Sequence, residues 1–255
     1  MRDGSNERAA MSRVICWFSC GATSAVAAKL AIAEYPEAEV VRMMIDSEHP
    51  DGNRFAADVQ AWLGKPIKEI RSPNARTHWE VIERDRYING PTGARCTMIL
   101  KRRVRADYQR PDDLHVFGFD YAEEDRVADF RENHPDLNFI APLIDAGLSK
   151  EDCLGILQRA GIRPHAMYEL GYPNANCVGC VKGGMGYWNK IRVDCPDVFA
   201  RMAKNERDIG ATCIKRKDGT RVWLDELDPN AGRDEPPLVA ECTILCHLAL
   251  DKVGL

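Results

Sequence analysis

The sequence of 255 residues lacks the features that mark several large classes of protein. No stretch approaches the run of about 20 apolar residues that a membrane-spanning helix needs, and the polar start MRDGSNERAA has no apolar segment of the kind found in signal peptides. Neither an internal repeat nor a coiled-coil pattern appears. We therefore expect a soluble, cytoplasmic protein with no membrane partner, in which residues 1–11 form a disordered leader.

Two common nucleotide-binding motifs are also missing. There is no Gly-Lys-Ser/Thr of a Walker loop and no GxGxxG of a dinucleotide-binding fold. Positive charge is in deficit as well, because 35 Lys and Arg residues stand against 39 Asp and Glu residues, for a net charge of −4. This balance argues against a general nucleic-acid coat, although the basic run 101–105 (KRRVR) could bind phosphate.

Cysteine, by contrast, is plentiful, with ten residues. Without a secretion signal these cysteines are expected in a reducing compartment, where metal or thiol chemistry is favoured over a disulfide framework. Not all of them need a function. Cys16 lies in an apolar strand pattern, Cys153 on the apolar face of a helix pattern and Cys213 in a short strand pattern, so we expect these three to be small buried hydrophobic residues.

Strand and helix patterns alternate along the first half of the chain. This order predicts an α/β fold, a doubly wound and mostly parallel sheet over residues 12–145, followed by a small cysteine-rich C-terminal region over residues 146–255 with a KDGT hairpin. The expected strands span residues 13–18, 39–45, 66–70, 114–119 and 138–143, and the expected helices span 22–35, 55–63, 77–85 and 97–109.

The stretch FSCGATSA follows the first expected strand. Ser19, Gly21 and Ser24 stand where the chain leaves a buried strand and enters a helix, so backbone N–H groups and two hydroxyls would face an anion at the positive end of the helix. The alternative is a helix that is merely capped by serine.

The stretch NANCVGCVKGG contains Cys177 and Cys180 in a C-x-x-C pattern, which suits zinc, a redox couple or an iron–sulfur cluster. Glycines 179, 183 and 184 allow tight turns and would leave N–H groups free to point at cluster sulfurs, while Tyr187 and Trp188 could shield a redox centre from water.

Four sequence elements, in the same order, resemble the phosphoadenosine phosphosulfate reductase family within the adenine nucleotide alpha-hydrolase (PP-loop) superfamily. The resemblance covers roughly residues 13–210. Its elements are the S-x-G-x-x-S loop at 19–24, ARCTMILKR at 94–102, VFGFDYAEEDR at 116–126, and the run from PLIDAGLSKEDC at 142–153 to GYPNANCVGCVKGG at 171–184.

The resemblance implies an adenine nucleotide, either ATP or phosphoadenosine phosphosulfate with Mg²⁺ as a further expectation, laid across the carboxyl edge of the sheet. Its phosphates or sulfate would bind the loop formed by Ser19, Cys20, Gly21, Ala22, Thr23 and Ser24. The loop departs from the usual SGGxDS form, because Cys20 replaces a glycine and Thr23 replaces the aspartate. Asp46 and Glu48 could supply the missing acidity, or Asp46 could instead cap the next turn.

The resemblance also implies a [4Fe–4S] cluster on Cys96, Cys177 and Cys180, with zinc as the alternative metal. Cluster-bearing adenylyl-sulfate reductases carry adjacent cysteines at the first element, where this chain has Arg95 and Cys96. Two alternatives remain open: either one iron has no protein ligand, or another cysteine supplies the fourth bond, for which we considered Cys195, Cys242 and Cys246.

The C-terminal ECTILCHLA faintly resembles the tail of sulfonucleotide reductases, in which a cysteine attacks the sulfate sulfur. Cys242 would be that nucleophile. Thr243 stands in place of the usual glycine and His247 arrives late, and Cys242 and Cys246 could equally bind a metal or pack on one helix face.

Two basic residues stand out from the solvated charges. Lys101, which follows Cys96 on an expected helix, would lie beside the cluster and bind phosphate or sulfate. Arg126, after the acidic run, is a candidate clamp for polyphosphate. The lone histidines His78 and His165 are expected to be structural.

Three functions follow. The first is sulfur transfer, in which an acceptor in a nucleic acid or small molecule is adenylated and receives sulfur from an iron–sulfur cluster with an open iron. The second is reduction of a sulfonucleotide, with Cys242 as nucleophile and an electron donor such as thioredoxin. The third is a noncatalytic nucleotide-sensing module. A homodimer is a further expectation, and sulfur transfer is the preferred interpretation.

Overall fold

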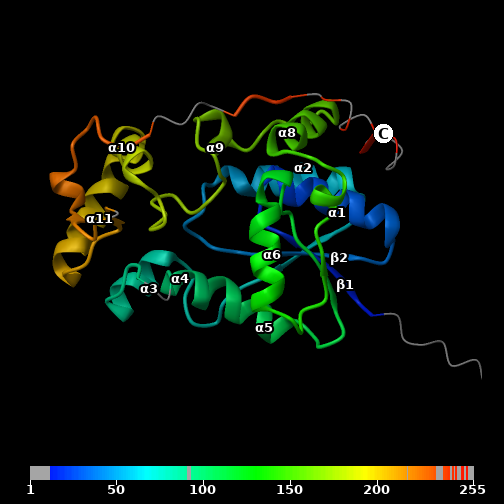
Figure 1. Cartoon of the computed structure of the whole chain (residues 1–255), viewed down its shortest axis with the longest axis horizontal. Helices are drawn as coiled ribbons and strands as arrows, with labels where there is room; N and C mark the ends of the chain where they lie inside the picture. The colour runs from blue at the N-terminus through cyan, green and yellow to red at the C-terminus, as the bar shows by residue number, and fades with distance from the viewer. Residues whose placement is uncertain are drawn as a thin grey trace, which may run out of the picture.

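The computed structural model describes residues 12–90, 93–216, 218–233, 238–241, 243, 245, 248–249 and 251. The predicted leader at residues 1–11 lies outside them. Five strands form one parallel sheet in the order β3-β2-β1-β4-β5, of which β1 and β2 are labelled in Figure 1. The parallel α/β fold is therefore confirmed. The strands are β1 (Val14–Phe18), β2 (Glu39–Met43), β3 (Ile67–Ile70), β4 (Leu114–Val116) and β5 (Phe139–Ile140).

The central strand β1 is buried along its whole length, as expected for a parallel strand covered on both faces. Its even-numbered side chains, including that of Cys16, join one apolar core, and Ile15 and Trp17 join a second cluster on the opposite face. The alternation follows from the strand period of two.

Helices cover both faces of the sheet. Helix α1 (Ala22–Glu34), rich in alanine, packs closely against β1 and α8 (Lys150–Arg159) in the first core, with α2 (Asp51–Leu63) beside it. Cys153 of α8 is fully buried there, as predicted. On the opposite face, Tyr108 at the end of α5 packs against Trp17. The remaining elements of this half are η2 (Tyr121–Glu123), α6 (Glu124–Asn133) and α7 (Pro142–Asp145).

The single helix expected at residues 97–109 is three consecutive segments. They are α4 (Arg95–Thr97), a π-helical turn η1 (Met98–Arg102) and α5 (Arg103–Tyr108). The widened turn contains Lys101. π-Helical turns inside helices often occur at functional sites.

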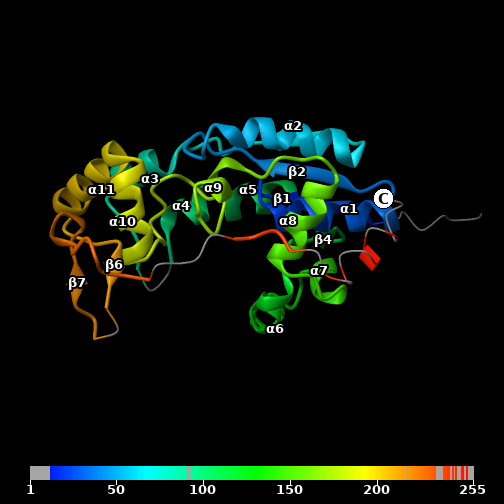
Figure 2. The same cartoon turned by 90° about the horizontal axis from the view of Figure 1, so that it is seen from above.

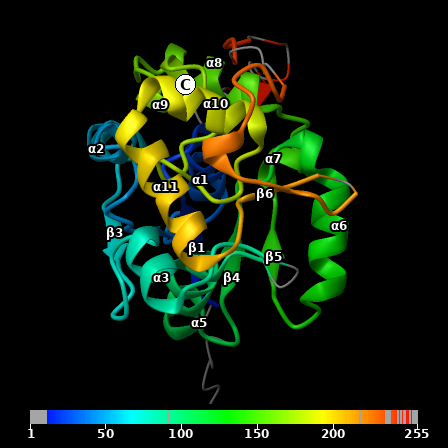
Figure 3. The ribbon, with the colours of Figure 1, turned by 90° about the vertical axis from the view of Figure 1, so that its left-hand side faces the viewer.

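A second core lies at one end of the molecule, where α10 and α11 meet α3 (His78–Asp85), as the turned views show (Figures 2 and 3). The expected hairpin is present, with β6 and β7 antiparallel. The elements here are α9 (Ala166–Glu169), α10 (Met185–Asp194), α11 (Pro196–Ile209), β6 (Ile214–Lys215), β7 (Arg221–Val222) and η3 (Leu224–Glu226).

The two cores do not divide the chain simply at residue 145. Helix α8, from the predicted C-terminal region, packs on α1 in the first core, and Trp79 and Ile82 of α3, from the predicted nucleotide domain, belong to the second. In the part of the chain that the structure describes, no helix combines the length and apolar character needed to cross a membrane.

Candidate functional site: a nucleotide loop and a thiol cavity

The loop Ser19–Ser24 joins β1 to α1 at the point where the sheet order reverses. β1 lies between β2 and β4, and ligands of open α/β sheets bind beyond the carboxyl ends of strands at such a position. Cys20 has φ = +58°, a left-handed conformation that costs a non-glycine residue about 1–2 kcal/mol. Its backbone therefore adopts the geometry that a glycine at this position would favour.

The loop is held partly by its own hydrogen bonds. The Ser19 N–H donates to Ser24 Oγ at 3.1 Å, and Ser24 Oγ donates to the Gly21 carbonyl at 3.0 Å. Because Ser24 is also buried, its hydroxyl fixes the shape of the loop. The N–H groups of Cys20, Gly21 and Thr23 have no hydrogen-bond acceptor among the described residues, which leaves three donors for an anion at the helix N-terminus.

Gly118, which follows β4, lies directly against the start of α1. A Cβ atom at this position would be 2.7 Å from both the N and Cα of Ser24. Only glycine therefore lets the chain leaving β4 pass this close to the loop.

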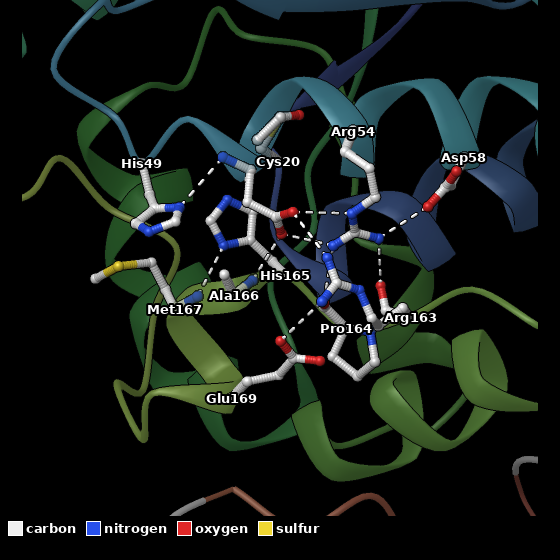
Figure 4. Close-up of polar contacts among 12 residues, drawn as sticks. Cys20, His49, Arg54, Asp58, Arg163, Pro164, His165, Ala166, Met167 and Glu169 are labelled. Carbon is white, nitrogen blue, oxygen red and sulfur yellow. Dashed lines mark hydrogen bonds and ion pairs between the residues drawn. The ribbon is translucent and has the colours of Figure 1, made fainter.

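A network of hydrogen bonds around the N-terminus of α2 supports the loop (Figure 4). The Cys20 thiol is buried and donates to the Gly52 carbonyl at 3.5 Å, which links the loop to the first turn of α2. Asp51 accepts hydrogen bonds from Arg54 and from the Ala166 N–H at 2.8 Å, which ties α2 to α9. The Arg54 guanidinium holds the pKa of Asp51 below its usual range.

Helix α9 connects this network to the loop. Tyr168 Oη accepts a hydrogen bond from the Ala22 N–H at 3.2 Å, the first amide of α1. His165 Nδ1 accepts from the Met167 N–H at 3.1 Å, and burial lowers the pKa of His165 to about 4. His165 is therefore neutral near pH 7 and caps α9, in line with a structural role.

The two acidic candidates after β2 differ in environment. Asp46 is partly exposed and forms ion pairs with Arg71 and, at 3.8 Å, with Arg76. Glu48 is nearly buried, with Arg42 at 3.7 Å and Lys101 at 3.9 Å from its carboxylate oxygens. Burial raises the pKa of Glu48, and the two cations oppose this effect. The Glu48 carboxylate thus lies between the side chains of Arg42 and Lys101.

Cys96, Cys177 and Cys180, although distant in sequence, line one small cavity of about 110 Å³ together with His78 and Lys101. The fold therefore brings the three predicted metal ligands to one place.

The C-x-x-C segment is fastened to the exit of β2. Cys177 forms a β-bridge with Glu48, and the Val178 N–H donates to the Ser47 carbonyl at 3.0 Å. His78 bridges Ser47 Oγ (2.7 Å) and the Gly179 carbonyl (3.2 Å). This again fits a structural histidine, which here links the thiol cavity to the carboxyl edge of the sheet.

Tyr187 makes hydrogen bonds that change the expectation for the glycine N–H groups. Its hydroxyl accepts hydrogen bonds from the N–H groups of Gly179 (3.0 Å) and Cys180 (2.9 Å), so these amides are already satisfied and not free for cluster sulfurs. Gly179 has φ = +81°, and a Cβ there would be 2.6 Å from Val198. Trp188 is fully buried in the second core. The glycine and the tyrosine thus set the shape of the C-x-x-C turn.

The three thiols are the right type of donor for a [4Fe–4S] cluster or zinc. Burial raises the pKa of Cys177 to about 12 and also raises the pKa of Cys96, so binding of a metal would have to displace protons. Within the described ranges, no three His, Cys, Asp or Glu side chains converge closely enough to hold a metal ion as they are positioned.

Sequence reasoning missed the polar contacts of Cys213. This residue is partly buried against the second core, and its N–H donates to Glu206 Oε1 at 2.6 Å. Burial raises the pKa of the Cys213 thiol, and the Glu206 carboxylate beside it raises the pKa further. No spacing in the sequence signals this contact, because it depends on how the chain before β6 packs against α11.

The remaining candidate residues do not line the thiol cavity in the part of the chain that the structure describes. Arg126 is exposed; it pairs with Glu123 and its guanidinium lies 5.4 Å from the centre of the Phe119 ring. Cys242, Cys246 and His247 lie outside the described residues.

The neighbours of Cys242 are placed against α8. The Glu241 N–H donates to the Glu151 carbonyl at 3.1 Å, and Thr243 Oγ1 donates to Asp152 Oδ1 at 2.6 Å. This part of the tail therefore lies on the first core, beside α8.

No protein-family model matches the chain. It is 28% identical over 184 residues to an "Uncharacterized 37.8 kDa protein in gpa 5'region" of Escherichia phage 186. The match covers 72% of this chain and 51% of that protein, so the chain spans about half the length of the curated relative that it matches. These comparisons assign no family to the chain, and its parallel α/β fold comes from the structure.

Proposed function

We propose that this protein is an adenine-nucleotide-dependent sulfurtransferase similar to the phosphoadenosine phosphosulfate reductase family. The loop Ser19–Ser24 binds the nucleotide phosphates through the N–H groups of Cys20, Gly21 and Thr23. Support comes from the position of the loop at the reversal of the sheet order and from its three N–H groups without an acceptor among the described residues.

The observation that carries the proposal is the shared cavity of Cys96, Cys177 and Cys180. A [4Fe–4S] cluster held by these thiolates would have one iron without a protein ligand, and this iron would bind the inorganic sulfide that is transferred. Lys101, between Glu48 and the cavity, attracts an anion into it.

The reaction has two steps. An oxygen of the acceptor attacks the α-phosphorus of ATP, and pyrophosphate leaves. A sulfide ion then attacks the carbon that carries the adenylated oxygen, so that a C–S bond forms, the C–O bond breaks and AMP leaves with the electron pair of that bond. In both steps the loop amides stabilise negative charge on phosphate oxygens.

A sulfonucleotide reductase is the second candidate. The hydrogen bonds from Glu241 and Thr243 to α8 favour it, because they hold the segment around Cys242 on the same core as α1, which begins at the loop. In this reaction the Cys242 thiolate would attack the sulfate sulfur, and the adenosine phosphate would leave.

One assay separates the two functions. Anaerobically purified protein is incubated with labelled phosphoadenosine phosphosulfate and a dithiol, and sulfite is measured for the wild type and for Cys242→Ser. Sulfur transfer predicts no sulfite from either, with ATP bound more tightly than the sulfonucleotide in calorimetry. Sulfite from the wild type but not from Cys242→Ser would establish the reductase.

A further inference from the structure

A second, larger cavity of about 540 Å³ opens beside the thiol cavity. The two share Asn176, Cys180 and Lys182 among their lining residues. The volume lies within the range of small-molecule sites, about 300–1,000 Å³. Whatever binds in the larger cavity therefore lies next to a thiol of the proposed cluster.

The charge of this cavity is opposite to that of the whole protein. Lys182, Lys190 and Arg233 line it, and none of the described residues that line it is acidic, although the chain carries a net charge of −4. Lys190 is paired with Asp194 at 3.1 Å. Lys182 and Arg233 have no ion-pair partner in the part of the chain that the structure describes. Two cations are thus available to an anion.

The start of α10 forms one wall. Gly183, Gly184 and Gly186 line the cavity, and the helix has neither a side-chain cap nor an acidic residue in its first turn. A Cβ on Gly183 would lie 1.9 Å from the Tyr187 ring, so glycine is needed for this close wall. The first-turn N–H groups of this ten-residue helix add to the positive potential of Lys182 and Arg233.

The rest of the lining is apolar or amide-bearing. Tyr172, Tyr187 and Met185 contribute rings and a thioether, and Asn174 and Asn176 contribute amides that can donate and accept. An apolar wall with amides and cations suits a flat heterocycle that carries a phosphate.

We propose that this cavity binds the sulfur acceptor, and that the acceptor is a nucleotide unit whose base lies toward Cys180 and whose phosphate binds Lys182 and Arg233. The proposal rests on the proposed function for the role of acceptor, but the binding itself does not require turnover.

The test is a binding titration on the full chain, using three probes: uridine, uridine monophosphate and a labelled eight-nucleotide single-stranded RNA. Arg233 is the main variant because it lines this cavity but neither the thiol cavity nor the cavity at Arg95. Arg233→Ala and Lys182→Ala should each weaken binding of the phosphate-bearing probes about tenfold, the loss expected for a hydrogen bond to a charged group. Lys204→Ala, which removes an exposed cation on α11, is the control.

Tighter binding of the RNA than of the monophosphate would identify a nucleic acid as the source of the nucleotide, and the reverse would identify a free nucleotide. The proposal would be overturned if the wild type bound neither uridine monophosphate nor the RNA. It would also be overturned if Lys204→Ala weakened binding of these two probes as much as Arg233→Ala does. ATP affinity, measured on the same variants, should not change. If the wild type did not bind ATP, the proposed function would be contradicted. The titration with the phosphate-bearing probes would still test this cavity independently.

Discussion

The nucleotide loop and the thiol cavity are assembled in different ways. The loop consists of six consecutive residues, is held partly by the bond from Ser19 to Ser24, and starts from a strand buried on both faces. The cavity joins α4 to the segment 177–180, which depends on Val198 and Tyr187 from elsewhere in the chain. A site formed by consecutive residues can be recognised in the sequence as a motif. A site formed by tertiary contacts can be recognised from the sequence only in part.

The largest expected effect concerns the cavity. Cys177→Ala should remove all bound iron and bleach the protein, because a methyl group cannot replace a thiolate ligand. Iron content and visible absorbance of anaerobically purified protein measure this. Cys153→Ala, a fully buried cysteine in α8, should keep its iron. If Cys177→Ala retained its full iron content, the cavity would not be the cluster site.

Next comes the loop. Gly118→Ala should destabilise the protein by about 1–3 kcal/mol and weaken ATP binding, because the new Cβ would meet the backbone of Ser24 at 2.7 Å. Gly21→Ala should cost less, since its Cβ would meet the hydroxyl of Tyr168 at 3.3 Å. Thermal unfolding and calorimetry with ATP check the order, and a reversed order would mean that the loop is not held against β4 as described.

The fold was predictable from the sequence because its signals are local. Buried strands such as Val14–Phe18 read as apolar runs, and the alanine-rich α1 reads as a helix. The ends of the strands were predicted less accurately. The fourth strand was expected to span residues 114–119 but ends at Val116, and Gly118 already lies against Ser24 of α1. The π-helical turn at Lys101 was not predicted, because a segment of five residues is too short to show an apolar period of its own.

The site was predictable only as far as its motifs reach. The three cysteines were found by their resemblance to a family and do line one cavity. The neighbourhood of Cys213, the satisfied amides at Gly179 and Cys180, and the basic cavity beside them depend on contacts between distant segments. Periodicity and spacing carry no information about such contacts.

A smaller effect is expected from acid. His165 is buried among Asp51, His49, Arg54 and Arg42, and its pKa is about 4 in the folded protein against 6.5 for an exposed histidine. The unfolded chain then binds more protons, so the free energy of unfolding should fall, by roughly 1–3 kcal/mol, as pH drops from 6.5 to 4. Urea unfolding of wild type and His165→Gln measures this, and the variant should show a shallower fall. If the free energy of unfolding fell equally with pH in both proteins, a group other than His165 would cause the fall.

The smallest effect is predicted for Cys213. If one iron has no protein ligand, Cys213→Ser should keep the cluster, as should Cys195→Ser, since serine is close in size to cysteine. At position 213 the serine hydroxyl can also take over the side-chain hydrogen bond of the thiol to Glu206. Iron content and electron paramagnetic resonance of the reduced proteins compare the two. Loss of the cluster in Cys213→Ser alone would identify Cys213 as the fourth ligand and remove the open iron.

The central claim is that a parallel α/β protein with this loop carries an iron–sulfur cluster on Cys96, Cys177 and Cys180. The most direct measurement is the iron, zinc and acid-labile sulfide content of the anaerobically purified wild type. The account predicts about four irons and four sulfides per chain, with no stoichiometric zinc. A colourless protein with one zinc per chain, or with no metal, would contradict it.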